Sequence, residues 1–320
     1  MSFAFVSPGQ GSQSIGMLAD LAGLGDTVRR TFTEASDTLG YDLWEVTQGG
    51  PRERLDSTEC TQPAMLAAGV ATYRLWLQRG GGEPVVVSGH SLGEFTALVC
   101  AGALDFAAAI DLVRFRGQVM QSAVPAGQGA MAAVLGLEDA EVVAACQEAA
   151  QGEIVEAANF NSPGQVVIAG QTAAVERALE IARKKGAKRA MTLPVSVPSH
   201  TSLMREAGQR LAGKLAEVRF ASPRIRYISA VDAEPHVDPA EIRQHLARQL
   251  ARPVLWTRTV QGLLAQQVRQ LIECGPGRVL TALNRRIEKR PDVGYFALED
   301  AASLESALTA TQTSAGATHA

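Results

Sequence analysis

The sequence has few of the features that mark disulfide-rich or metal-binding chains. Its 320 residues include only four cysteines, Cys60, Cys100, Cys146 and Cys274, and this wide spacing matches no metal motif. A chain of this length can bury a large core without a disulfide framework. We therefore expect reduced thiols, no metal site and a cytoplasmic location.

Long apolar runs and an excess of one charge are also missing. No apolar stretch approaches 18 residues, and no basic and apolar leader precedes the strand-like residues 3–6, so we expect neither a membrane span nor a secretion signal. The net charge of -3, with 20% charged residues, is ordinary for a soluble protein and excludes a generally basic nucleic-acid binder. Ser14 stands where a dinucleotide fingerprint beginning at Gly9 and Gly11 would need its third glycine.

Basic residues are nevertheless concentrated in two places. Residues 240–290 contain ten Arg or Lys against three Glu, a local charge of +7. A second cluster consists of Arg183, Lys184, Lys185, Lys188 and Arg189. These clusters could attract an acidic partner or a phosphorylated cofactor, and solvated helix faces are the alternative interpretation.

The most informative stretch is PVVVSGHSLGEFTAL at residues 84–98. Three consecutive valines, at 85–87, predict a strand buried on both faces. Gly89 and Gly93 flank Ser91 at two residues on either side, as a sharp strand-to-helix turn requires. This pattern is typical of a nucleophile elbow, in which the serine hydroxyl stands clear at the start of a helix. A tight turn with a buried serine remains the alternative.

The rest of the chain alternates strands and helices, which predicts an α/β fold with a parallel sheet. A strand at 3–6 precedes helices at 27–39 and 62–78, and helices at 106–122 and 239–250 follow the elbow. The pattern of residues 130–193 instead predicts the element order βαββαβ, which is the ferredoxin-like arrangement. We predict a discontinuous large domain at 1–126 and 196–308, an inserted ferredoxin-like subdomain at 127–195, and a disordered tail at 309–320. A cleft between the two units is a natural ligand site.

Two further residues are candidates for a site. Arg116 falls within the apolar half of its predicted helix, and a buried guanidinium needs an anionic partner. Pairing with a carboxylate of the protein is the commoner arrangement, and ligand binding is the alternative. His200 follows a Pro-Ser break at a predicted helix start and could serve as the base that a serine nucleophile requires, or could cap or pack the helix. Of the other histidines, His90 is interpreted as supporting the turn, and His236 and His245 as surface residues.

Several motifs, in order along residues 3–300, resemble the bacterial malonyl-CoA:acyl carrier protein transacylase family. They are FAFVSPGQGSQ at the start, TQPA at 61–64, GHSLGEFTALVCAG, RFRG around Arg116, NFNSPGQVVIAG, PVSVPSH ending at His200, and ECGPGRVL. The resemblance implies a hydrolase-like α/β core and transfer of malonyl from malonyl-CoA to the phosphopantetheine thiol of an acidic acyl carrier protein. It also implies no permanently bound cofactor.

The resemblance also implies roles for individual residues. Ser91 would be the nucleophile and His200 its base, the backbone amides of Gln10 and Leu92 would form the oxyanion hole, and Arg116 would bind the malonyl carboxylate. In this family a backbone carbonyl replaces the third triad member and orients the histidine, and we expect it at Gln249.

Three matters stay open at this point. Related polyketide synthase acyltransferase domains that select malonyl often carry a bulky residue where this chain has Ser199, so exclusion of methylmalonyl is open. A serine hydrolase with the same elbow would use water as the acceptor. A non-catalytic subunit that docks a carrier protein would use only the basic stretches.

Overall fold

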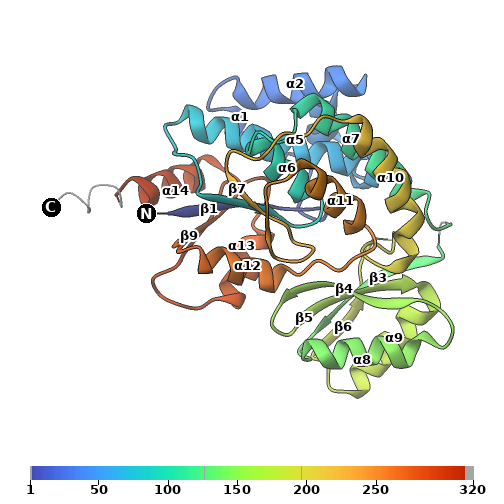
Figure 1. Cartoon of the computed structure of the whole chain (residues 1–320). Coiled ribbons are helices and arrows are strands. Elements are labelled where there is room, and N and C mark those ends of the chain that lie inside the picture. Colours follow the sequence, from blue (N-terminus) through green and yellow to red (C-terminus); the bar gives the residue numbers. More distant parts are fainter. Residues whose placement is uncertain (1, 126, 196, 314–320) are drawn as a thin grey trace.

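The computed structural model describes residues 2–125, 127–195 and 197–313, and within them the large unit is organised around a six-stranded sheet (Figure 1). Neighbouring strands are parallel except at one edge, where β8 runs antiparallel to β7. In spatial order the strands are β10 (Gly294–Ala297), β9 (Gln270–Glu273), β1 (Phe3–Ser7), β2 (Val86–Gly89), β7 (Arg226–Ile228) and β8 (Pro235–His236). The predicted parallel sheet is therefore confirmed.

Helices cover both faces of this sheet, because successive side chains along its strands point to opposite faces and both faces are apolar. Phe3 and Phe5 of β1 point to one face, whereas Ala4 and Val6 point to the other. On the first face lie α1 (Ala19–Ala22), α2 (Thr27–Leu39), α3 (Leu43–Gly49), α4 (Arg52–Asp56), α5 (Thr58–Gln78), α6 (Gly93–Cys100), α7 (Phe106–Gln121), α10 (Arg205–Glu217), α11 (Pro239–Gln249) and α14 (Ala301–Thr313). On the second face lie α12 (Trp256–Ala265) and α13 (Val279–Ile287). None of the helices in the described ranges has the length and apolarity that a bilayer crossing requires.

The predicted ferredoxin-like subdomain is confirmed as a four-stranded antiparallel sheet with two helices on one face (Figure 1). Its strands, in the order β4-β5-β3-β6, are β4 (Val155–Ser162), β5 (Gln165–Gln171), β3 (Gly129–Leu135) and β6 (Arg189–Thr192), and its helices are α8 (Asp139–Ala150) and α9 (Thr172–Lys184). The exact boundaries at 127 and 195 stay a prediction.

The subdomain is joined to the large unit through β4. Register shifts interrupt the pairing of β4 with β5 on either side of Asn159. The backbone of Phe160 donates to the carbonyl of Val254 at 2.9 Å, and the amide of Val254 donates to the carbonyl of Ala158 at 2.9 Å. This short parallel bridge between β4 and the segment before α12 brings residues 159–161 close to the end of β2.

Two predictions about local structure are wrong. Val85 is 48% exposed and precedes β2, because the buried strand begins only at Val86. The predicted disordered tail begins too early: α14 continues to Thr313, because Leu304, Ala307 and Leu308 are buried and the Gln270 side chain donates to the carbonyl of Ala310. Residues 314–320 lie outside the described residues.

Replacing Gly89 by Ala tests how tightly the turn after β2 is packed. A Cβ on Gly89 would lie 1.9 Å from the backbone carbon of Gly93, so backbone must move. We expect Gly89→Ala to lower the free energy of unfolding by about 3 kcal/mol or more in chemical denaturation. The matched control is Gly213→Ala in the exposed part of α10, where a Cβ meets nothing within 4 Å. That variant should gain about 0.5–1 kcal/mol. Equal effects of the two substitutions would contradict the packing argument.

Candidate active site

Ser91 lies in a strained turn between β2 and α6. Its φ is +53°, in the left-handed region that residues with a side chain rarely adopt. The turn is held in place by close backbone contacts on both sides, since a Cβ on Gly93 would lie 2.0 Å from the carbonyl oxygen of Ser7. Strain of this kind at a serine that lines a cavity is characteristic of a nucleophile elbow, the turn that the sequence predicted here.

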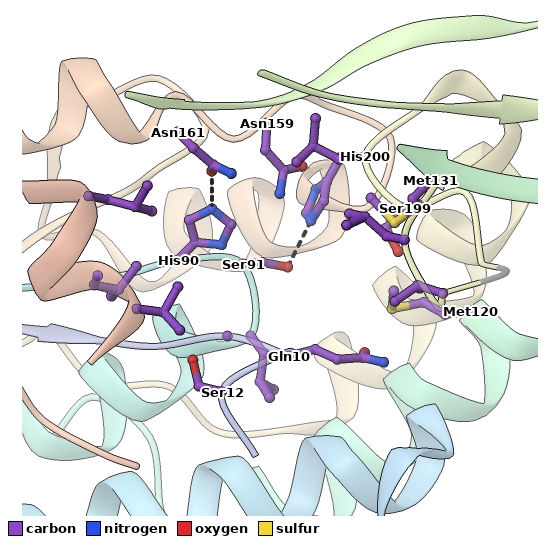
Figure 2. Close-up of a pocket in the computed structure, with 18 of the residues that line it drawn as sticks. Gln10, Ser12, His90, Ser91, Met120, Met131, Asn159, Asn161, Ser199 and His200 are labelled. Carbon is purple, nitrogen blue, oxygen red and sulfur yellow. Dashed lines mark hydrogen bonds between the residues drawn. The ribbon is translucent and has the colours of Figure 1, made fainter. Parts of the chain in front are cut away.

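His200 lies 109 residues after Ser91 in the sequence, and the fold brings its side chain next to that serine. Ser91 Oγ and His200 Nε2 are 2.8 Å apart (Figure 2). On the other side of the ring, Nδ1 donates to the carbonyl oxygen of Gln249 at 2.9 Å and faces that of Arg252 at 3.2 Å. Because a carbonyl can only accept, these contacts assign the proton to Nδ1 and leave the Nε2 lone pair facing the serine. A serine hydroxyl, an imidazole nitrogen and an orienting carbonyl in this order are what a nucleophile, its base and its orienting group in acyl transfer require.

The imidazole of His200 is held in its neutral form. Burial, followed by the positive charge of Arg116, lowers its pKa from 6.5 to about 3, and the hydrogen bond to Gln249 only partly opposes this. The ring is therefore available as a proton acceptor throughout the neutral range.

Arg116, on α7, is 1% exposed and points at the same serine. It donates to Gln62 Oε1 at 2.9 Å, to Gln249 Oε1 at 2.8 Å and to Ser91 Oγ at 3.1 Å. In the described part of the chain, no carboxylate lies within ion-pair distance of the guanidinium, and its buried Nε has no hydrogen-bond partner. Burial lowers the pKa of Arg116 to about 9.

The ion pair with a protein carboxylate that the residue pattern alone favoured is therefore wrong. The nearest compensation comes from Glu94, which raises the pKa of Arg116 through its charge without touching it. A buried cation with spare donors beside Ser91 is suited to bind an anionic group of a ligand.

Sequence reasoning missed the buried network behind these residues. Gln249 was expected to act only through its carbonyl, but its side-chain amide also donates to the carbonyl oxygen of Ser91 at 3.0 Å and to Glu94 Oε1 at 2.9 Å. Glu94 in turn accepts from the Tyr227 hydroxyl and from the amide of Ala230. Burial raises the pKa of Glu94. The available signal was a lone carboxylate in the apolar helix GEFTALVC.

A cavity of about 200 Å³ lies in front of Ser91, between the large unit and the subdomain, where the sequence predicted a cleft. The subdomain contributes Met131, Asn159 and Asn161 to its lining, opposite Ser91 of the elbow (Figure 2). Val167 of the subdomain and residues of α13 also line it. His90 does more than support the turn, because its Nε2 lies 2.9 Å from Asn161 Oδ1 and so connects the two units.

Gln10 and Leu92 also line this cavity. Among the hydrogen bonds of residues 2–125, 127–195 and 197–313, neither of their backbone N–H groups is a donor. Free amides at the start of α6 and in the loop after β1 are suited to an oxyanion, with support from the helix dipole. Their role in an oxyanion hole stays a prediction.

The low pKa of His200 can be tested by NMR titration of its ring. In the free protein we expect His200 to remain neutral well below pH 6.5, and Arg116→Ala to raise its pKa, because the substitution removes a repulsive charge. The unfolded chain binds a proton below about pH 6.5 that the folded chain does not, so His200 makes stability fall as the pH drops from 6.5 toward 3. Titration near 6.5 in the unaltered protein would contradict the proposed environment.

Comparisons with known proteins agree with this geometry. Residues 4–306 match the family model described as acyl transferase domain. The malonyl CoA-acyl carrier protein transacylase of Salmonella typhimurium is 53% identical over 307 residues, which cover 96% of this chain and 99% of the relative.

Solved structures give the same result. An acyl carrier protein S-malonyltransferase from Vibrio cholerae is 56% identical, with a TM-score of 0.93 and coverage of 96% of this chain and 100% of that chain. A malonyl-transacylase solved in complex with a type II PKS acyl-carrier protein is 52% identical, with a TM-score of 0.95 and coverage of 97% and 100%. On this evidence of sequence, fold and site together, the chain belongs to the malonyl CoA-acyl carrier protein transacylase family.

Proposed function

We propose that this protein transfers the malonyl group of malonyl-CoA to the phosphopantetheine thiol of an acyl carrier protein, through a malonyl ester on Ser91. The malonyl-carrier protein formed in this way supplies fatty-acid elongation. The observation that carries the proposal is the buried guanidinium of Arg116, unpaired with any carboxylate in the described chain and 3.1 Å from the hydroxyl that His200 Nε2 approaches at 2.8 Å. The names of the relatives support the same substrates.

The first half of the reaction forms the ester. His200 Nε2 takes the proton of Ser91 as Oγ attacks the thioester carbonyl, and the amides of Gln10 and Leu92 stabilise the oxyanion that develops. The intermediate collapses with loss of the CoA sulfur, which receives the proton from His200. The hydrogen bond from Nδ1 to Gln249 stabilises the transient imidazolium.

The second half reverses these steps with a different thiol. The thiol of the carrier arm gives its proton to His200 and attacks the ester, and Ser91 Oγ leaves with that proton. Throughout, Arg116 holds the malonyl carboxylate as a charge-assisted pair. Binding this anion also offsets the positive charge that lowers the pKa of His200, so substrate binding makes His200 a stronger base.

The surface around the cavity suits an acidic carrier. Leu280 and Leu283 of α13 line the cavity, while Arg285 and Arg286 on the same helix are exposed. We propose that these arginines contribute to transient docking of the carrier protein. We also propose a cytoplasmic location, which the four free and buried cysteines support.

Formation of the serine ester is tested by intact-mass analysis after brief incubation with malonyl-CoA. We expect an adduct of one malonyl group that is absent in Ser91→Ala and retained in Ser12→Ala, a second serine of the cavity lining. Adding carrier protein should discharge the adduct much faster than water does. An adduct retained by Ser91→Ala would refute the proposal, and steady hydrolysis that ignores the carrier would favour a hydrolase.

The role of Arg116 is tested by substrate selection. Arg116→Ala should lower kcat/KM for malonyl-CoA by about 10²–10³-fold, because a buried charge pair with the substrate is lost, and should affect acetyl-CoA far less. Arg114→Ala is the matched control, since Arg114 lies on the same helix, is partly exposed and pairs with Asp111. An unchanged preference for malonyl over acetyl in Arg116→Ala would exclude Arg116 as the carboxylate receptor.

A further inference from the structure

A second cluster of chemically reactive side chains lies away from the cavity, where the β7–β8 connection meets α11. Asp232 precedes β8, His236 ends it, and His245 lies on α11. One candidate ligand atom from each residue lies within 4.8 Å of the others. The sequence suggested that both histidines are surface residues; their side chains are half-buried, with 12% and 17% of their surface exposed.

The separations within this cluster match those of a metal coordination sphere. Asp232 Oδ2 is 3.0 Å from His236 Nε2 and 3.6 Å from His245 Nδ1. In a tetrahedral zinc site with metal–ligand bonds of 2.0–2.1 Å, neighbouring ligand atoms lie about 3.3 Å apart. The two distances lie on either side of this value, and the third separation, between the two histidine nitrogens, is at most 4.8 Å, so side-chain rotation would bring the three atoms to this spacing.

The histidines present suitable ring nitrogens toward the centre of the cluster. Within the described chain, His245 Nδ1 is buried, has no hydrogen-bond partner and lies 3.6 Å from Asp232 Oδ2, so this nitrogen faces the cluster without a hydrogen bond. A hydrogen-bonded pair of Asp232 and His236 alone explains neither this orphaned nitrogen nor the close approach of the two imidazoles, whose centroids are 4.0 Å apart. A shared cation explains both.

A supporting shell is also present. On the far side of the His236 ring, Nδ1 lies 3.6 Å from Glu241 Oε2, which is the place of the carboxylate that orients a metal-bound histidine. The other oxygen of the Asp232 carboxylate, Oδ1, accepts from the amide of Glu234 at 3.1 Å. Both contacts favour side-chain orientations in which His236 Nε2 and Asp232 Oδ2 face the centre of the cluster.

We propose that Asp232, His236 and His245 form a binding site for Zn²⁺, with a water molecule in the fourth position. Two imidazoles and one carboxylate are ligands that zinc accepts in this geometry. Bound there, the ion would fasten the β7–β8 connection to α11.

Both of the segments that the site joins also contribute residues to the network behind the cavity. His245 lies four residues, about one helical turn, before Gln249, whose carbonyl accepts from His200. Ala230, two residues before Asp232, donates to Glu94 at 3.2 Å. Zinc would therefore stabilise the part of the fold that supports the base.

The site is tested on tag-free, chelator-treated protein by calorimetric titration with Zn²⁺ and by the visible absorption spectrum of Co²⁺ as a substitute. We expect one tight site, a tetrahedral cobalt spectrum, and a rise in Tm of about 4 °C at a hundredfold excess of Zn²⁺ over Kd. Mg²⁺, which prefers octahedral oxygen ligands, should give no shift. Failure of the unaltered protein to bind Zn²⁺ or Co²⁺ would overturn the proposal.

Variants locate the site. Asp232→Asn and His245→Gln should each weaken Zn²⁺ binding at least about a hundredfold, and Glu241→Gln about tenfold, as expected for direct and supporting positions. Glu180→Gln, an exposed carboxylate on α9, removes the same charge elsewhere and should bind normally. Tm values without metal show which variants remain folded. Wild-type affinity in folded Asp232→Asn or His245→Gln would refute the assignment.

Discussion

Gln249 is the residue through which Ser91, His200 and the buried cation of Arg116 are joined. Its carbonyl accepts from His200 Nδ1, its side-chain oxygen accepts from Arg116, and its side-chain amide donates to the backbone of Ser91 and to Glu94. A neutral amide can make all of these contacts at once because it offers both donors and acceptors. An aspartate in the same place would neutralise Arg116 directly and remove its attraction for a substrate carboxylate.

The electrostatics of the site follow from this arrangement. Arg116 is desolvated but has no direct counter-charge in the described chain. In the free enzyme, therefore, no ion pair offsets the free-energy cost of desolvating its guanidinium. Glu94 lies beyond Gln249 and acts at longer range. A malonyl carboxylate would complete the pairing, and in the proposed function this would make charge on the acyl group a condition for tight binding.

The inserted subdomain closes the cavity from the side opposite the parallel sheet. One face of its sheet is covered by α8 and α9, and on the other face Met131 and Val167 line the cavity. The bridge between β4 and Val254 and the contact of Asn161 with His90 fix its position. Consequently, the walls around Ser91 come from two independently packed sheets, and an acyl group on Ser91 would meet a surface that neither sheet could form alone.

Local patterns in the sequence determined much of the secondary structure and the turn at Ser91. Glycines around Ser91 predict the elbow because only they allow the close backbone contacts, and the βαββαβ order predicts the subdomain because hydrophobic periodicity specifies each element. The resemblance further implied Ser91, His200, Arg116 and the Gln249 carbonyl. Only the tertiary structure decided that Arg116 lacks a carboxylate partner, that Glu94 and the Gln249 side chain support it, and that His236 meets His245. These depend on contacts between residues more than a hundred positions apart, or on the packing of a loop against a helix, and no local pattern encodes such distances.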